Sequence, residues 1–341
     1  MKITCFCTLS TGLIPIDYAL QSGVKIDKVI GLNPKSVNNL EKVSGYVDVA
    51  DFCIDRNISY EYVDKYNLKD INPVDILNSV DLIWVNGWQR LIPKEFINFP
   101  NLAVIGAHGS CDGITKGRGR SPQNWAIIIG AKDFHVSLFK ISEGIDDGDI
   151  VATESFEIMD NDTILNSYLK SGIACAKGII KVSEDSSLIN NAKSQNSEPE
   201  YFPKRVPEDS FIDWNMTSHD IFNQVRALSD PYPNSRTILN DKVVYINKCS
   251  FFDYNLKYKP GQIIFKYPTG EVIVGCRKGV LIIEDYTTDD ANKDVFEVGQ
   301  VFESINMQNI VNSIIGRFEN EFTGKKLNSS LEKFWKVRGY L

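Results

Sequence analysis

The chain has 341 residues, with 37 Lys plus Arg against 44 Asp plus Glu, and so carries a net charge of −7. This acidic balance argues against a protein that holds nucleic acid by bulk attraction to phosphate, because such domains are usually basic. Hydrophobic residues at 43% exclude a wholly disordered chain, and no apolar run approaches the roughly 20 residues that a bilayer span needs. We therefore expect a soluble, cytoplasmic protein of two domains.

The first half of the chain alternates short apolar strands with helical segments. Strands are predicted at residues 2–7, 28–32, 81–85 and 102–106, with a turn at Ser10-Thr11-Gly12 and a helix over 14–21. Apolar runs of this length, separated by helices, are typical of buried parallel strands in a doubly wound sheet. Ligands bind beyond the carboxyl ends of such strands. We therefore expect chemistry directly after Val85 and Ile105.

The second half predicts a smaller β domain. Short β-rich runs between residues 211 and 301 are divided by the turns Pro260-Gly261, Thr269-Gly270 and Lys278-Gly279, which is typical of a small barrel or sandwich. The segment 184–203 is rich in Ser, Asn and Asp, and it predicts a linker or an exposed excursion.

The seven cysteines and three histidines give little support for a metal site or a disulfide framework. The cysteine number is odd and the residues are scattered, so we expect reduced, mostly buried thiols. Cys5 and Cys7 share one face of the first predicted strand, but no second close pair and no nearby His supports a metal there. We expect no metal.

The most informative stretch lies between residues 101 and 150. His108 follows a buried strand, a Gly/Arg-rich loop covers 116–122, and an acidic glycine turn covers 143–149. A His in this place suits proton transfer, because imidazole exchanges protons near neutral pH and a nearby carboxylate can orient its ring. The alternative is that His108 merely caps a loop and that the acidic turn is solvated.

Four blocks in the right order resemble the 10-formyltetrahydrofolate-dependent formyltransferases. This family includes methionyl-tRNA formyltransferase and N-formyltransferases of nucleotide-linked amino sugars. The blocks are Asn86-Gly87-Trp88-Gln89-Arg90-Leu91-Ile92-Pro93, Arg118-Gly119-Arg120-Ser121-Pro122 with Trp125-Ala126-Ile127, Asp146-Asp147-Gly148-Asp149-Ile150, and Asp213-Trp214 through Pro231-Tyr232-Pro233. The fold expected is α/β. A Rossmann-like doubly wound catalytic domain would cover 1–205, a β-barrel (OB-like) domain 206–301, and a helical and basic extension 302–341.

The resemblance also implies a mechanism. An acceptor amine attacks the formyl carbon of 10-formyltetrahydrofolate, an Asn-x-His pair stabilises the oxyanion, and a distant Asp holds the His and assists proton movement. His108 and Asp146 match the catalytic His and Asp of the family. Arg90, Leu91 and Ile92 match its folate loop, and Asp146 is also expected at the folate.

One position departs from the family pattern. Gly106 stands two residues before His108, where the family has Asn, and loss of one oxyanion donor typically costs ~10²–10³ in rate. Three readings are open. Asn124 or Asn86 substitutes for the missing amide, His108 works with backbone N–H groups and water, or the chain is a non-catalytic relative. Asn124 is the candidate catalytic amide.

Charge argues about the acceptor. A tRNA substrate favours a basic surface, whereas a nucleotide diphosphate needs only a few cations and the N–H groups of a helix start. The residues expected to contact the acceptor are Ser10, Thr11, Lys116, Arg118 and Tyr232.

The sequence thus predicts an N-formyltransferase that acts on a nucleotide-linked amino sugar, with 10-formyltetrahydrofolate as formyl donor. Methionyl-tRNA formyltransferase and a non-catalytic folate- or nucleotide-sugar-binding relative are the alternatives. Neither tRNA nor a membrane is an expected partner. The apolar residues after Phe302 suit packing on the chain's own body or on a second copy, so a homodimer is a candidate assembly.

Overall fold

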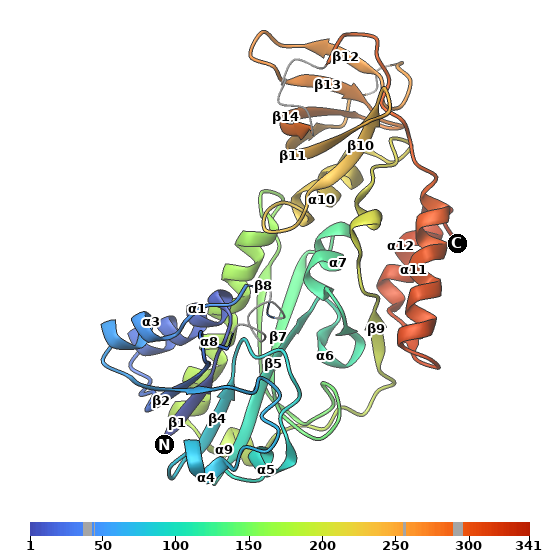
Figure 1. The fold of residues 1–341 in the computed structure, drawn as a ribbon. Coiled ribbons are helices and arrows are strands. Elements are labelled where there is room, and N and C mark those ends of the chain that lie inside the picture. The colour runs from blue at the N-terminus through green and yellow to red at the C-terminus, as the bar shows by residue number, and fades with distance from the viewer. Residues whose placement is uncertain (37–42, 44, 255–256, 289–295) are drawn as a thin grey trace. The chain divides into compact units, whose positions relative to one another are not determined.

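The computed structural model describes residues 1–36, 43, 45–254, 257–288 and 296–341, which form two compact units (Figure 1). The first unit comprises Met1–Thr115, Phe134–Phe156 and Tyr168–Glu198, and the second comprises Lys116–Asp133, Glu157–Ser167 and Pro199–Leu341. Within these described ranges, no helix combines the length and the apolar character that crossing a bilayer requires. The domain limits expected at 205 and 301 stay a prediction.

A seven-stranded sheet forms the centre of the first unit (Figure 1). Its order is β3-β2-β1-β4-β5-β7-β8. The strands are β1 (Ile3–Phe6), β2 (Lys28–Leu32), β3 (Ser59–Val63), β4 (Leu82–Val85), β5 (Ala103–Ser110), β7 (Asp133–Lys140) and β8 (Ile150–Glu157). Neighbours from β3 to β5 pair in parallel, whereas β5 and β7 pair antiparallel. The predicted α/β class with a mainly parallel N-terminal sheet is confirmed.

Helices surround this sheet, and two of them pack closely. The helices are α1 (Ser10–Gln21), α3 (Ala50–Asp55), α4 (Pro73–Ile76), α5 (Lys94–Ile97), α6 (Gly113–Lys116), α8 (Ile164–Glu184) and α9 (Ser187–Asn190). A Cβ on Gly172 of α8 would lie 3.0 Å from Ile14 of α1, so small residues allow the two helices to approach.

The predicted turn at Ser10-Thr11-Gly12 is wrong, because α1 already begins at Ser10. A Cβ on Gly12 would lie 2.8 Å from both the Asn86 carbonyl oxygen and the Cys7 sulfur. The glycine therefore allows close packing within a helix rather than a break in it.

The strand expected to end at Ile105 also runs further. The parallel partner β4 pairs with β5 only as far as Ile105, but β7 continues the ladder on the other side. Gly106 lies opposite Phe139, and His108 lies opposite Ser137. His108 is therefore a strand residue rather than a residue of the following loop.

The second unit contains a five-stranded antiparallel sheet of order β10-β11-β14-β13-β12, as expected for a small C-terminal β domain (Figure 1). Its strands are β10 (Ser235–Leu239), β11 (Lys242–Phe252), β12 (Ile263–Lys266), β13 (Val272–Gly275) and β14 (Val280–Thr288). Trp214 stacks on Phe302 at 5.2 Å and donates from Nε1 to Thr237 Oγ1 at 2.9 Å, which anchors the sheet to the chain before and after it.

A small parallel sheet joins distant segments of the second unit. It consists of β6 (Arg118–Gly119), β9 (Glu200–Phe202) and β15 (Lys326–Leu327), in the order β15-β9-β6. Tyr201 and Phe202 are buried, so the end of the segment expected to be a linker belongs to a core. The buried carboxylate of Glu200 accepts bonds from the Ser329 N–H and hydroxyl, both at 2.8 Å.

The C-terminal extension is part of the second unit. Its helices are α11 (Met307–Glu321) and α12 (Ser329–Val337), and the unit also contains α7 (Pro122–Ile128), α10 (Ser218–Ala227) and the 3-10 helix η1 (Pro207–Ser210). Arg317 of α11 donates to both carboxylate oxygens of Asp209, at 2.6 and 2.7 Å. Trp335 of α12 packs edge-on against Trp125 at 5.9 Å. The extension thus packs on the chain's own body.

Candidate active site

The structure brings His108 and Asp146 together. Nδ1 of His108 lies 3.4 Å from Oδ2 of Asp146, and their side chains are 12% and 25% exposed. The imidazole comes from β5, and the carboxylate comes from the loop after β7. A carboxylate at this distance can orient an imidazole for proton transfer.

The loop that carries Asp146 is tightly folded around two glycines. A Cβ on Gly148 would lie 1.7 Å from the Lys140 carbonyl oxygen, and one on Gly144 would lie 1.9 Å from Asp147 Oδ2, so a larger residue at either position would clash. Asp146 itself has a φ of +52°, a conformation that L residues rarely adopt. Such backbone strain persists only where the surroundings enforce it.

Gln195 supplies part of that enforcement. Its Nε2 donates to the Asp146 carbonyl at 3.0 Å and to the Gly148 carbonyl at 2.8 Å, while its Oε1 accepts from the Thr115 hydroxyl at 2.9 Å. The sequence analysis missed this residue, which lies inside the segment expected to be a linker. A single Gln in a polar segment carries no pattern that would have revealed it.

The four residues expected at the folate line one pocket. Arg90, Leu91, Ile92 and Asp146 border a cavity of about 250 Å³, together with Gly106. The Leu91 side chain is 65% exposed and can cover a flat ligand. Of the expected catalytic pair, Asp146 therefore belongs both to this pocket and to the contact with His108.

Tyr66 holds the loop on which Arg90 lies. Its hydroxyl accepts from the Gln89 N–H at 2.7 Å and is hydrogen-bonded to the Thr8 hydroxyl at 3.2 Å. The Arg90 guanidinium lies over the Tyr66 ring at 4.9 Å. These contacts order the loop around residues 88–92, so its main-chain groups are fixed before a ligand arrives.

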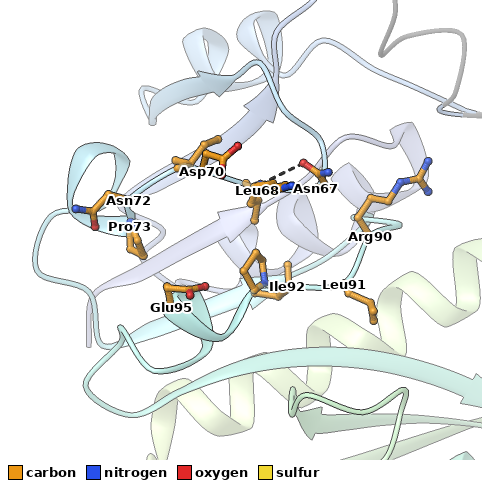
Figure 2. Close-up of a pocket in the computed structure, with 12 residues that line it drawn as sticks. Asn67, Leu68, Asp70, Asn72, Pro73, Arg90, Leu91, Ile92 and Glu95 are labelled. Atoms are coloured by element: carbon orange, nitrogen blue, oxygen red, sulfur yellow. Dashed lines mark hydrogen bonds between the residues drawn. The ribbon is translucent and has the colours of Figure 1, made fainter.

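A second, more open groove adjoins this pocket through Arg90, Leu91 and Ile92 (Figure 2). It has a volume of about 830 Å³ and lies between residues 67–73 and residues 90–95. Figure 2 shows the Arg90 guanidinium pointing away from the Glu95 carboxylate. Lys65 neutralises Asp70 at 3.0 Å.

Gly106 has close neighbours in place of the amide that the family carries. A Cβ there would lie 3.2 Å from Cγ1 and Cδ1 of Ile141 and 3.4 Å from the ring of Phe139. A larger residue at 106 would therefore have to displace both side chains.

The two amides considered as substitutes have other partners. Nδ2 of Asn86 donates to the Gly12 carbonyl, and Nδ2 of Asn124 donates to the Ala227 carbonyl at 2.8 Å. Oδ1 of Asn124 is buried and has no hydrogen-bond partner. The atom that Asn124 presents is thus an acceptor, and its catalytic role stays a prediction.

The residues expected at the acceptor have different environments. Ser10 and Thr11 are exposed in the first turn of α1. Lys116 is exposed at the end of α6, whereas Arg118 is only 7% exposed in β6. Tyr232 lines a cavity of about 130 Å³ in the second unit, together with Asn124. The acceptor roles of these residues stay predictions.

The metal-ligating residue types give no candidate centre in the part of the chain that the structure describes. No group of three or more His, Cys, Asp or Glu side chains there is arranged to hold a metal ion. All seven cysteines are free thiols, and six of them are buried. Burial raises the pKa of the Cys7 thiol to about 12, which disfavours the thiolate that a metal would need.

Comparison with known protein families gives two matches. Residues 15–180 match the family described as Formyl transferase, and residues 204–301 match Formyl transferase, C-terminal domain. A methionyl-tRNA formyltransferase of Clostridium novyi (strain NT) is 30% identical over 229 residues, which is 66% of this chain and 69% of that protein. The bifunctional polymyxin resistance protein ArnA of Wigglesworthia glossinidia brevipalpis is 29% identical over 289 residues, which is 83% of this chain but 42% of that protein.

Solved structures share the fold. WlaRD, a sugar 3N-formyl transferase crystallised with dTDP and 5-N-formyl-THF, has a TM-score of 0.57 at 21% identity, over 86% of this chain and 99% of that chain. HypX from Aquifex aeolicus, in complex with tetrahydrofolic acid, has a TM-score of 0.56 at 18% identity, over 96% of this chain. The chain spans 48% of HypX, as it spans less than half of ArnA.

Proposed function

Because this chain belongs to the formyl transferase family, we propose that it transfers a formyl group from 10-formyltetrahydrofolate to the amine of a nucleotide-linked amino sugar. The observation that carries the proposal is the double role of Asp146, which contacts His108 and also lines the pocket with Arg90, Leu91 and Ile92. A proton-transfer pair at the wall of a ligand pocket is what an acyl-transfer reaction requires.

The pocket suits the pterin ring of the formyl donor. Leu91, Ile92 and Ile145 offer apolar surface to the faces of a flat heterocycle, and the main chain of residues 89–92 offers N–H and C=O groups to its polar edge. The adjoining open groove gives the benzoyl-glutamate tail a path outward, where Lys69 and Arg90 suit carboxylates. The donor supplies the formyl group, and the protein supplies position and proton transfer.

His108 and Asp146 would handle the protons. When Nδ1 of His108 carries a proton, it can donate to the Asp146 carboxylate, and Nε2 is then the nitrogen that can accept a proton from the attacking amine. Asp146 also stabilises the imidazolium that this transfer produces. Gln195 acts through Asp146, because it holds the main chain on both sides of the strained residue.

The oxyanion would be stabilised without a side-chain amide at position 106. The engaged Nδ2 atoms of Asn86 and Asn124 favour the reading in which His108 acts with main-chain N–H groups and water. A shift of the Asn124 amide from Ala227 onto the substrate is the alternative, and its cost is the loss of a 2.8 Å hydrogen bond.

Charge and kinship point to different acceptors. The net charge of −7 and the sugar formyltransferase WlaRD support a nucleotide-linked sugar. The identity to methionyl-tRNA formyltransferases supports initiator tRNA as the second candidate.

The test is a turnover screen of the full chain with 10-formyltetrahydrofolate and a panel of uridine- and thymidine-diphosphate amino sugars, with methionyl-tRNA as the competing acceptor. Formylation of a nucleotide sugar at a kcat/KM at least a hundredfold above that for methionyl-tRNA is expected. The reverse preference contradicts the sugar acceptor. Folate binding without turnover on any acceptor contradicts an enzyme.

A further inference from the structure

A small cavity in the second unit carries an unpaired buried acceptor. The cavity has a volume of about 130 Å³. It is bordered by the start of α7, by the segment that leads into η1 and by the loop after α10. Its walls are formed by Ser121, Asn124, Arg205, Val206, Pro207, Ser210, Leu228, Tyr232, Pro233 and Asn234. All of these residues lie within one unit, so the cavity is a feature of that unit by itself.

Asn124 gives this cavity a specific chemistry. Its side chain is 1% exposed, and Nδ2 donates to the Ala227 carbonyl at 2.8 Å. Since a carbonyl can only accept, this bond fixes which end of the amide carries the hydrogens. Oδ1 is left buried without a partner. A buried acceptor is stabilised by a ligand that donates an N–H or O–H to it.

Arg205 supplies the complementary donors. Its guanidinium lies over the Trp125 ring at 4.7 Å and donates once, to the Asp209 carbonyl at 2.9 Å. Burial lowers the pKa of the Arg205 guanidinium to about 10, which leaves it protonated at neutral pH. The nearby Asp209 carboxylate is already held by both of its oxygens on Arg317, so the charge of Arg205 remains for a ligand.

Size restricts the ligand to one ring. An engineered cavity of about 150 Å³ in another protein binds benzene, so about 130 Å³ suits a single six-membered ring and excludes a fused pair. Leu228, Pro207 and Pro233 supply apolar surface for its faces. A ring with an N–H donor beside a carbonyl acceptor matches Asn124 and Arg205 together.

We infer that this cavity binds the uracil or thymine ring of the acceptor nucleotide. The ring N3–H donates to Asn124 Oδ1, and an adjacent ring carbonyl accepts from the Arg205 guanidinium. The inference rests on the proposed nucleotide-sugar acceptor and narrows it to a pyrimidine with an imide edge. Cytosine presents an acceptor at N3, and a purine exceeds the cavity.

The test is binding of nucleoside monophosphates to the full chain by calorimetry. UMP and dTMP are expected to bind, with CMP and AMP at least tenfold weaker. N3-methyl-UMP, which lacks the N3–H, is expected to bind at least tenfold more weakly than UMP. This ligand change leaves the protein untouched, so it decides the question even where a variant fails to fold.

A pair of variants tests the second contact. Arg205→Met is expected to weaken UMP at least tenfold, whereas the control Lys204→Met removes the same charge from the exposed neighbouring residue and should change affinity less than twofold. Equal binding of all four nucleotides, or an unchanged affinity for N3-methyl-UMP, overturns the inference. Formylation of nucleotide sugars without such selectivity overturns the inference alone. Absence of both nucleotide binding and sugar turnover overturns the proposed function as well.

Discussion

Replacing Gln195 by Met should impair catalysis without removing any group that touches substrate. Met has a similar length but donates no hydrogen bond, so the Asp146 and Gly148 carbonyls lose their bonds of 3.0 and 2.8 Å. Two neutral bonds of this kind are worth about 1–3 kcal/mol together. The left-handed conformation of Asp146 costs about 1–3 kcal/mol, so the two amounts are comparable and the loop can relax.

The expected consequence is a lower population of the arrangement in which Asp146 faces His108. A loss of about 1–3 kcal/mol corresponds to a fall in kcat/KM of about 5- to 150-fold. Steady-state formyl transfer measures it, with a thermal melt to check that the fold survives. The control is Ser194→Ala, which removes the adjacent 2.9 Å bond to Asp149 and should cost less than threefold. A Gln195→Met variant within twofold of the parent would refute the reasoning, as would an equal loss in the control.

Three further outcomes are expected at the reacting groups. His108→Asn should lower kcat by ~10²–10⁴ with an unchanged melting temperature, and retention of more than about a tenth of the rate would contradict its role in acid–base chemistry. Asp146→Asn should be nearly as damaging and Asp149→Asn milder; kinetics with the order reversed would mean that the acidic block was aligned wrongly. Gly106→Asn should not raise kcat/KM, because its Cβ would lie 3.2 Å from Ile141, and a tenfold gain in the same assay would show that the glycine is a simple lesion.

The parts of the fold that sequence predicted well are those in which local pattern and tertiary role agree. Buried parallel strands are short apolar runs, so β1, β2 and β4 were expected within two residues of their bounds. The family resemblance is confirmed by the two matching regions. His108 and Asp146 were expected to act together from motif order, and the structure places them 3.4 Å apart.

The parts that failed depend on partners far away in the chain. Nothing in the sequence Gly106 to Ser110 suggests a strand, because its pairing comes from β7 rather than from its own side chains. Glu200 to Phe202 form β9 only because β6 and β15 lie beside them, and these strands come from residues far earlier and far later. Gln195 was invisible for a related reason, since its carbonyl partners are 47 and 49 positions away.

The same small sheet has a consequence for synthesis of the chain. Arg118 in β6 emerges from the ribosome about 200 residues before Lys326 in β15, and at roughly 5–20 residues per second this interval is about 10–40 s. Throughout that time β9 can pair with β6, but its other edge is unpaired and Glu200 lacks its partners Ser329 and Lys326. The second unit therefore completes its folding only when translation nears the last helix, which leaves an open strand edge for a chaperone to shield in the meantime.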